Sequence, residues 1–377
     1  MAHIWIPNAR HRSVHLGKLT EVIGSAEQVD RLVQAMLPWY GPPIPVCVPG
    51  RIMAVKGGDF VGTLPKGKGY DLGRRIWDRA QRVNRLIAEG RHLNAGFTSL
   101  SDLIAEASAG KRRTFKYYKT GPTGVANVSS SLLQIGGSPA AAANAGAAPG
   151  GDIPVDSTVG FHFFVNPAGG DTQHLVNGQG MASVVNNTVL VYDCLFRVNK
   201  TMNSTATEAV TGVPTRYQSQ VGTDPNYIGG NFLFVQVGLT VLAATAHNWT
   251  VCLYTDQGGV SSTLPSLVGN ASAAIHRLDH PVNQWFAPLA NGDDGIKALT
   301  QMQCSALVAT GVINFVIGHP LGWMVFPVVN TMFFFDWINT IFNLARVFDD
   351  AALALLEVNK PATTATTYNM LVDTVSG

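Results

Sequence analysis

The stretch Ala298–Phe335, ALTQMQCSALVATGVINFVIGHPLGWMVFPVVNTMFFF, runs for 38 residues without an Asp, Glu, Lys or Arg. A membrane helix needs about 20 consecutive apolar residues, and polar residues interrupt every window of that length here. Pro320 and Pro327 would break a helix, while Thr310–Gly311 and Gly318–Pro320 have the composition of turns. The stretch therefore predicts two or three buried strands joined by short turns, and no membrane segment.

The end of this stretch is its most aromatic part, MVFPVVNTMFFF. Apolar patches that stay exposed usually mark interaction sites, so we expect another subunit to cover this piece. The candidate interface residues are Trp323, Phe326, Phe333, Phe334, Phe335 and Trp337.

Short runs rich in Val, Leu, Phe, Tyr and Thr recur from residue 157 to the C-terminus, separated by Gly, Pro and Asn turns. They are TVGFHFFVNPAGG (158–170), NTVLVYDCLFRVN (187–199), NFLFVQVG to SSTLP (231–265), ATGVINFVIG (309–318) and ALALLEV to MLVDTV (352–375). TVCLYTDQGGVSSTLP predicts a hairpin. Because no helices alternate with these strands, the pattern predicts an α+β, mostly β chain whose residues 157–377 form an antiparallel β-sandwich or barrel-like domain.

Charge divides the chain into two parts. Residues 1–119 hold 19 Lys and Arg against 9 Asp and Glu, a net of +10, and the remainder holds 7 against 15, a net of −8. A basic N-terminal part is suited to nucleic acid or to an acidic protein surface. The low overall share of charged residues, 13%, is typical of a surface that is covered inside an assembly.

The basic part, residues 1–135, is predicted to be mainly helical. Apolar residues recur at helical spacing in GSAEQVDRLVQAMLPWYGPP (24–43), in YDLGRRIWDRAQRVNRLIAEG (70–90) and in TSLSDLIAEASAG (98–110), with Ser99 or Ser101 as the last helix's cap and Gly110 as its end. Leu100, Leu103 and Ile104 are expected to face inward. The Ala/Gly/Pro-rich residues 136–156 contain too few large side chains to build a core, so they predict a linker or an extended arm.

Two groups of cations are candidate contacts for a partner or for nucleic acid. Five lie on the second predicted helix: Arg74, Arg75, Arg79, Arg82 and Arg85. The other five lie in KRRTFKYYK: Lys111, Arg112, Arg113, Lys116 and Lys119. Interleaved aromatic residues could stack on bases there. An amphipathic edge strand with solvated basic residues explains the same pattern equally well.

No motif for catalysis, phosphate binding or a cofactor occurs in the chain. His276, Asp279 and His280 have a metal-ligand composition, but Pro281 favours a turn there instead of a helix. The four cysteines are scattered, without a Cys-x-x-Cys pair, so each is expected to be a small buried residue. We therefore expect no enzyme activity, no metal, no cofactor and no small-molecule substrate.

Three stretches, NKTMNSTATEAVTGVPTRYQS, HPVNQWFAPLANGDDGIKALTQMQCSA and ALALLEVNKPATTATTYNMLVDTVSG, resemble segments of virion structural proteins of tailed bacteriophages. The resemblance covers the chain from about residue 157 onward. It implies a capsid-associated structural role. Together with the low charge and the basic N-terminal part, it leads us to expect a multicopy component of the phage head, made in the host cytoplasm, whose partners are copies of itself, other capsid proteins and, through the basic region, packaged DNA. A decoration or cement protein, a shell subunit or major capsid protein, and a tail or receptor-binding β-domain all remain open.

Overall fold

The computed structural model describes residues 97, 99–123, 125–167, 171–217, 230–270, 274–309, 311–338, 344–358 and 364–377, together with the backbone of four short strands nearer the N-terminus. The chain divides into two compact units, Met1–His92 and Leu93–Gly377. In the first unit, β1 (His3–Trp5) pairs with β2 (Ser13–His15), and β3 (Ala54–Lys56) pairs with β4 (Asp59–Val61), both antiparallel. The helices predicted within 24–43 and 70–90 lie outside the described residues.

The second unit is mostly β, with antiparallel sheets, as predicted. Its central sheet has the order β11-β16-β9-β19-β6. These strands are β11 (Phe232–Val237), β16 (Val312–Phe326), β9 (Asn187–Thr201), β19 (Leu353–Val358) and β6 (Ser130–Ser131). The two longest strands, β9 and β16, pair along their whole lengths and are rich in β-branched and aromatic residues, which favour strands.

The turn predicted at Gly318–Pro320 is wrong, because β16 continues through it as one strand of 15 residues. The sheet accommodates the proline by two register shifts against β9, at Ile317/Gly318 and at Pro320/Gly322. Proline has no N–H to donate to a ladder and is tolerated in strands at such bulges. Of the turn predicted at Thr310–Gly311, Thr310 lies outside the described residues, and Gly311 has φ +114°.

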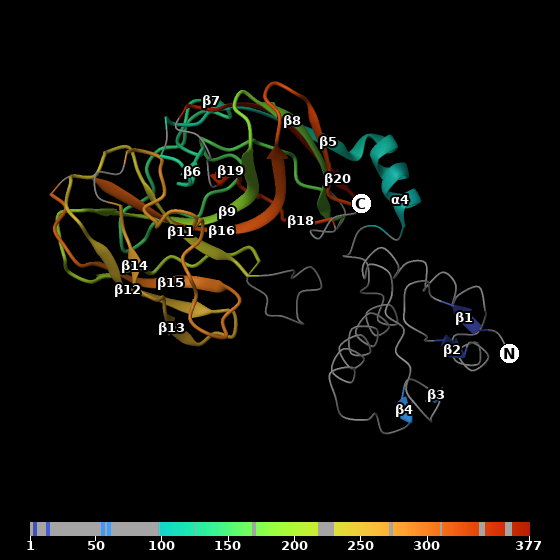
Figure 1. Cartoon of the computed structure of the whole chain (residues 1–377), viewed down its shortest axis with the longest axis horizontal. Helices are drawn as coiled ribbons and strands as arrows, with labels where there is room; N and C mark the ends of the chain where they lie inside the picture. Colours follow the sequence, from blue (N-terminus) through green and yellow to red (C-terminus); the bar gives the residue numbers. More distant parts are fainter. Residues whose placement is uncertain are drawn as a thin grey trace. The chain divides into compact units, whose positions relative to one another are not determined.

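The outer sheet has the order β17-β8-β20-β5-β7, and β18 also pairs with β8. Its strands are β17 (Phe333–Asp336), β8 (Gln173–Ala182), β20 (Thr367–Ser376), β5 (Arg112–Thr120), β7 (Gly137–Ser138) and β18 (Arg346–Val347). Figure 1 shows β8, β20 and β5 beside one another, near the short helix and the C-terminus. The outer sheet thus joins the last strand of the chain to a strand that begins at residue 112.

The third sheet has the order β10-β15-β12-β13, with β14 also on β12. It contains β10 (Glu208–Ala209), β15 (Ile296–Cys304), β12 (Asn248–Asp256), β13 (Ser261–Thr263) and β14 (Leu267–Val268). The predicted hairpin is confirmed as β12–β13. Its turn is closed by the Asp256 carboxylate, which accepts from the Val260 N–H at 2.7 Å, and Gly259 has φ +86°.

The central sheet is buried on both faces. One face shares a core with the other two sheets: Phe315 of β16 meets Trp249 of β12 edge-on, and Phe326 of the same strand lies beside Tyr368 of β20. The opposite face forms a second core, in which Tyr192 of β9 and Phe234 of β11 pack with loop residues such as Leu133. Burial on both sides explains why β9 reads as a nearly continuous apolar run instead of alternating.

The helix predicted within 98–110 is confirmed as α4 (Leu100–Glu106). The Ser99 hydroxyl accepts from the Asp102 N–H at 3.1 Å, which caps its first turn. One wider turn, η1 (Ala107–Lys111), ends it where Gly110 has φ +86°. Leu103 is buried as expected, but Leu100 and Ile104 are exposed, because a helix of two turns that packs on Val176 and Val375 buries only a narrow stripe.

The structure places the boundary between units after His92, not in residues 136–156. Strand β5 pairs with β20 over nine residues, so residues 112–120 belong to the β-rich unit. The Ala/Gly/Pro-rich segment lies along its own chain: Asp152 bridges to Arg197 of β9, where their side chains form an ion pair. Its small residues therefore allow close packing, as for Ala142 and Ala145, which are buried.

Candidate functional site

The five candidate cations at Arg74, Arg75, Arg79, Arg82 and Arg85 lie outside the described residues. The other five occupy η1 and β5, where the burial pattern alternates strictly from Lys116 onward. Phe115 and Tyr117 are buried, so these two rings do not stack on bases, and Tyr118 is exposed. The interpretation of KRRTFKYYK as an amphipathic strand is confirmed, but its basic residues are not all solvated, because Lys119 is buried.

Two of these cations are bound to carboxylates of the same chain. Lys111 Nζ lies 2.8 Å from Asp171 Oδ2 and 2.7 Å from Glu106 Oε2. These hydrogen bonds, Asp171 first, raise the pKa of Lys111. Arg112 pairs with Asp373, whose side chain is buried. Both cations therefore serve the junction between η1, β5 and β20.

Lys119 faces the interior, so it is a core residue instead of a contact for an external partner. Its Nζ donates to the carbonyl of Ile135 at 2.6 Å and also contacts that of Ala140. Burial lowers the pKa of Lys119 to about 8. The alternation of side chains along β5 places it on the same face as Phe115 and Tyr117.

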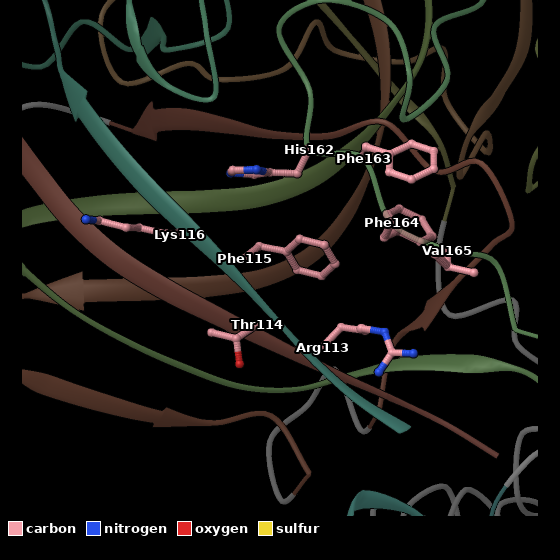
Figure 2. Close-up of a pocket in the computed structure, with 8 residues that line it drawn as sticks. All are labelled: Arg113, Thr114, Phe115, Lys116, His162, Phe163, Phe164 and Val165. Atoms are coloured by element: carbon pink, nitrogen blue, oxygen red, sulfur yellow. The ribbon is translucent and has the colours of Figure 1, made fainter. Parts of the chain in front are cut away.

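Arg113 and Lys116 are the exposed cations of β5 that make no ion pair within the described part of the chain. They line an open groove of about 420 Å³ between Arg113–Lys116 of β5 and the segment His162–Val165. Figure 2 shows the two strips side by side, with Phe115 and Phe164 between them. In this β5 groove the Arg113 guanidinium lies on the side of Val165, whereas the Lys116 ammonium points away from the 162–165 segment (Figure 2).

Segment 158–170 was predicted as a strand, yet its described residues 158–167 form turns and extended backbone without strand pairing. Phe164 turns inward, where its ring meets Phe115, and His162 stands edge-on to Tyr117 with ring centroids 4.7 Å apart. Burial lowers the pKa of His162. Phe163 and Val165 point to solvent, at 70% and 66% exposure, and sequence reasoning did not identify them because strand composition alone does not tell which residues find a partner strand.

The six candidate interface residues divide into three groups, which are buried, half-buried and mostly exposed. Phe326 and Trp337 are buried in the chain's own core, so they do not reach another subunit. Trp323 is half-buried against Trp285, edge-on at 4.7 Å. Phe333 and Phe335 are half-buried against the same core.

Phe334 is the one candidate interface residue whose side chain is mostly exposed, at 76%. Four further apolar side chains near it in sequence are also exposed: Val325, Val328, Val329 and Met332. We call these five residues the 325–334 surface. It coincides with the piece of sequence that was expected to be covered by another subunit.

The residues considered for a metal serve the fold. The buried Asp279 carboxylate accepts from Trp249 Nε1 at 2.7 Å and from the Asn270 N–H at 2.6 Å, and His247 Nε2 lies 2.9 Å from it. His280 Nε2 accepts from the Val235 N–H at 2.8 Å, and burial lowers its pKa to about 4. Across the described ranges, no group of three His, Cys, Asp or Glu side chains has a metal-binding arrangement.

Two further findings concern the cysteines and the search for membrane-spanning helices. Cys194, Cys252 and Cys304 are free and buried, as predicted, and Cys47 lies outside the described residues. Among the helices that the structure describes, none has the length and apolarity needed to cross a bilayer.

Comparisons with known proteins identify no family for this chain. No family model matches the chain, and no curated protein matches it. A solved structure of infectious bursal disease virus, Gt strain, contains a chain with 9% identity, aligned over 70% of this chain and 80% of that one, at a TM-score of 0.13. A similarity of that size carries no argument about fold or function.

Proposed function

We propose that this chain is a non-enzymatic structural protein of a tailed-phage virion, a multicopy component of the head that acts through packing between subunits. The observation that carries the proposal is the 325–334 surface: five exposed apolar side chains within ten residues, on a β-rich body that has a hydrophobic core of its own. Exposed apolar clusters of this kind mark sites that another protein covers. The resemblance of three sequence stretches to phage virion proteins supplies the class of partner.

The finer fold belongs to the same proposal. We take the central sheet as one layer of a β-sandwich, and the outer and third sheets, which share a core with one of its faces, as the opposite layer. We take the basic first unit as the part that grips a neighbouring subunit or faces packaged DNA. Sandwiches of this type suit shells because their rigid faces and edges present fixed surfaces to neighbours.

Two roles within the head are compatible with such a body. A shell subunit or major capsid protein assembles by itself and is present in hundreds of copies. A decoration or cement protein binds only to preformed heads and can be removed without dissolving them. Mild denaturant treatment of purified heads, followed by electron microscopy, separates the two roles, because loss of the chain leaves intact shells only in the second.

Nucleic-acid binding and a tail or receptor-binding role remain the alternatives. Within β5, the exposed cations without a carboxylate partner in the described residues reduce to Arg113 and Lys116, so support for nucleic-acid binding rests mainly on the first unit. Binding of the full chain to DNA should fall steeply with added salt if phosphates are contacted.

The direct test of the proposed function is mass spectrometry of purified particles. We expect peptides of this chain in stoichiometric amounts in heads that have been separated from tails. Its absence from particles would overturn the proposal, and its presence in tails alone would favour the receptor-binding alternative.

A further inference from the structure

The outer sheet ends in two open edges of different character. At one edge, β17 pairs with β8 and with no second strand among the described residues. At the other edge, the only described strand beyond β5 is β7, which covers Tyr118 and Lys119 alone. Among the described residues, neither β17 on its outer side nor residues 112–117 of β5 on theirs have a neighbouring strand, and such a sheet edge can template pairing with another chain.

The backbone of β5 points outward at the residues whose side chains are exposed. The Ser138 hydroxyl donates to the Lys116 carbonyl at 2.9 Å from the side opposite β20, so the Lys116 carbonyl faces the open edge. Because hydrogen-bonding direction alternates along a strand, Arg112 and Thr114 share this orientation. All three side chains are exposed, and the N–H groups of these residues point to the same open side.

In β17, too, the residues whose backbone groups point away from the sheet are the residues whose side chains are exposed. The Trp337 N–H donates to the Val176 carbonyl at 3.0 Å, so Phe335 and Phe333, two and four residues earlier, also direct their backbone groups toward β8. The backbone groups of Phe334 therefore point away from the sheet, and its side chain is the most exposed large apolar one described. Asp336 follows it on the same exposed face.

The strand directions and rows of the sheet fit a repeat between copies. Strand β17 runs parallel to β20 and opposite to β5, since each neighbouring pair is antiparallel. A second copy in the same orientation would thus bring its β17 antiparallel to β5. One row across the sheet is Phe334, Gln179, Leu371 and Lys116, and the next is Asp336, Asn177, Asp373 and Thr114. Continuing these rows puts Phe334 of the next copy opposite Lys116.

Charge selects this pairing over the two symmetric ones. In the continued rows, Asp336 of the next copy lies opposite Thr114 and diagonal to Arg112 and Lys116, within reach of long side chains. Pairing β5 with β5 would instead bring basic residues together, and pairing β17 with β17 would oppose two Asp336 carboxylates. Like charges across strands destabilise a ladder.

Apolar contacts flank the same edges. Phe163 and Val165, in the segment that forms one wall of the β5 groove, are exposed. On the other side, Val328, Val329 and Met332 precede β17 and are exposed. A strand added at β5 brings these two apolar groups to the same junction.

We propose that β17 of one copy pairs with β5 of the next, so that the outer sheet continues from subunit to subunit. The inference rests on the proposed function, for which it supplies the interface. Such a contact is head-to-tail, and it closes into rings or extends into an open array depending on the rotation between copies.

The first test uses two single-cysteine variants of the full chain, Thr114→Cys and Asp336→Cys, in a Cys47→Ser background; Cys194, Cys252 and Cys304 are buried. With a short bismaleimide, cross-linked dimers should form when the two variants are mixed and not from either variant alone. Dimers from Thr114→Cys alone would show β5 pairing with itself and overturn the inference. A wild-type chain that stays monomeric at every concentration would overturn it too.

The second test exchanges the charges. Lys116→Asp and Asp336→Lys should each weaken self-association about 5-fold per contact, while the double variant should restore it. Charged residues on edges can also serve to block pairing, in which case Lys116→Ala would strengthen association, contrary to the proposal. Mass spectrometry of particles is independent of both readouts, so presence of the chain in heads with no β5–β17 cross-link refutes this interface and leaves the proposed function standing.

Discussion

A buried ion pair between Arg216 and Asp193 lies where the central sheet meets its loops. The Arg216 guanidinium holds both oxygens of the Asp193 carboxylate at 2.8 Å, and the Ala352 N–H donates to the same carboxylate at 2.8 Å. Both side chains of the pair are nearly inaccessible to water. A bidentate pair of this kind is costly to desolvate but far more costly to break, since one charge would be left buried alone.

Asp193→Ala should therefore lower the free energy of unfolding by about 3 to 5 kcal/mol. Denaturant titration followed by tryptophan fluorescence measures it. The matched control is Arg113→Ala, which removes an exposed guanidinium bonded only to backbone carbonyls, and it should change stability by less than about 0.5 kcal/mol. If Asp193→Ala lowered the free energy of unfolding as little as the control does, the predicted contribution of the buried ion pair would be contradicted.

A second residue-scale prediction concerns acid sensitivity. His319 is buried between Asn231, 2.9 Å from its Nδ1, and the stacked ring of Tyr217, and burial lowers its pKa to about 3. Because the folded-state pKa lies below the unfolded value of about 6.5, protonation favours the unfolded chain. His319 therefore costs stability as pH falls from about 6.5 toward 3, by up to about 1.4 kcal/mol per pH unit.

In His319→Gln the free energy of unfolding should fall less steeply between pH 6.5 and 4 than in wild type, by up to about 1.4 kcal/mol per pH unit. Unfolding midpoints in urea at several pH values measure the slope. His247 is the internal comparison, since Asp279 raises the pKa of His247 despite its burial, so the stability contributed by His247 is present at low pH and is lost as pH rises through its folded-state pKa. An unchanged slope in the His319 variant would contradict the prediction.

Two neighbouring elements, β16 and β17, show that a single apolar stretch divides between interior and surface. Phe326, at the end of β16, is fully buried, whereas Phe334 of β17 is exposed. The difference follows from pairing: β16 lies inside the central sheet and β17 at the edge of the outer one. Composition is alike in both, so only position in the sheets separates core from surface.

Matched substitutions test this division. Phe326→Ala should cost about 3 to 5 kcal/mol of stability, because it removes a buried ring and leaves a cavity. Phe334→Asp should leave the unfolding free energy within about 0.5 kcal/mol of wild type and should abolish association, as measured by sedimentation velocity. Unfolding of the Phe334 variant would place that ring in the core.

At the scale of the whole molecule, the chain divides after His92, and strand β5 belongs to the β-rich unit. Amino-acid composition alone predicted a boundary in residues 136–156, where Ala, Gly and Pro replace charged residues. Those residues instead pack along β9, held by the Asp152–Arg197 ion pair. Low complexity in a sequence thus indicates either a linker or a segment that fits a narrow space.

A chain beginning at Leu93 should fold and unfold cooperatively, whereas a chain beginning at residue 136 should not. The shorter chain lacks β5 and exposes the faces of β20 and of the core that Phe115 and Tyr117 cover. Circular dichroism and thermal unfolding of the two fragments measure the difference. Cooperative folding of the fragment from residue 136 would restore the boundary expected from composition.

Much of the local structure could be predicted from the sequence. The alternation of KRRTFKYYK, the hairpin at Asp256 and the capped helix after Ser99 each depend on neighbouring residues only, and each is confirmed. Strand composition also identified β9 and β20. The strand through Gly318–Pro320 was missed because the bulges that admit Pro320 are made against β9, well over a hundred residues earlier in the chain.

The sequence by itself determined that this is a weakly charged, antiparallel β-rich chain with a basic N-terminal part, since side-chain periodicity and turn chemistry are local properties. Only the tertiary structure decided which cations are free, which aromatic rings remain exposed and which strands lie at an edge. Lys119 and Lys116 differ by three residues and are alike in chemistry, yet one is buried under carbonyls and the other faces solvent. Strand pairing makes that difference, because it fixes which side of β5 faces the core.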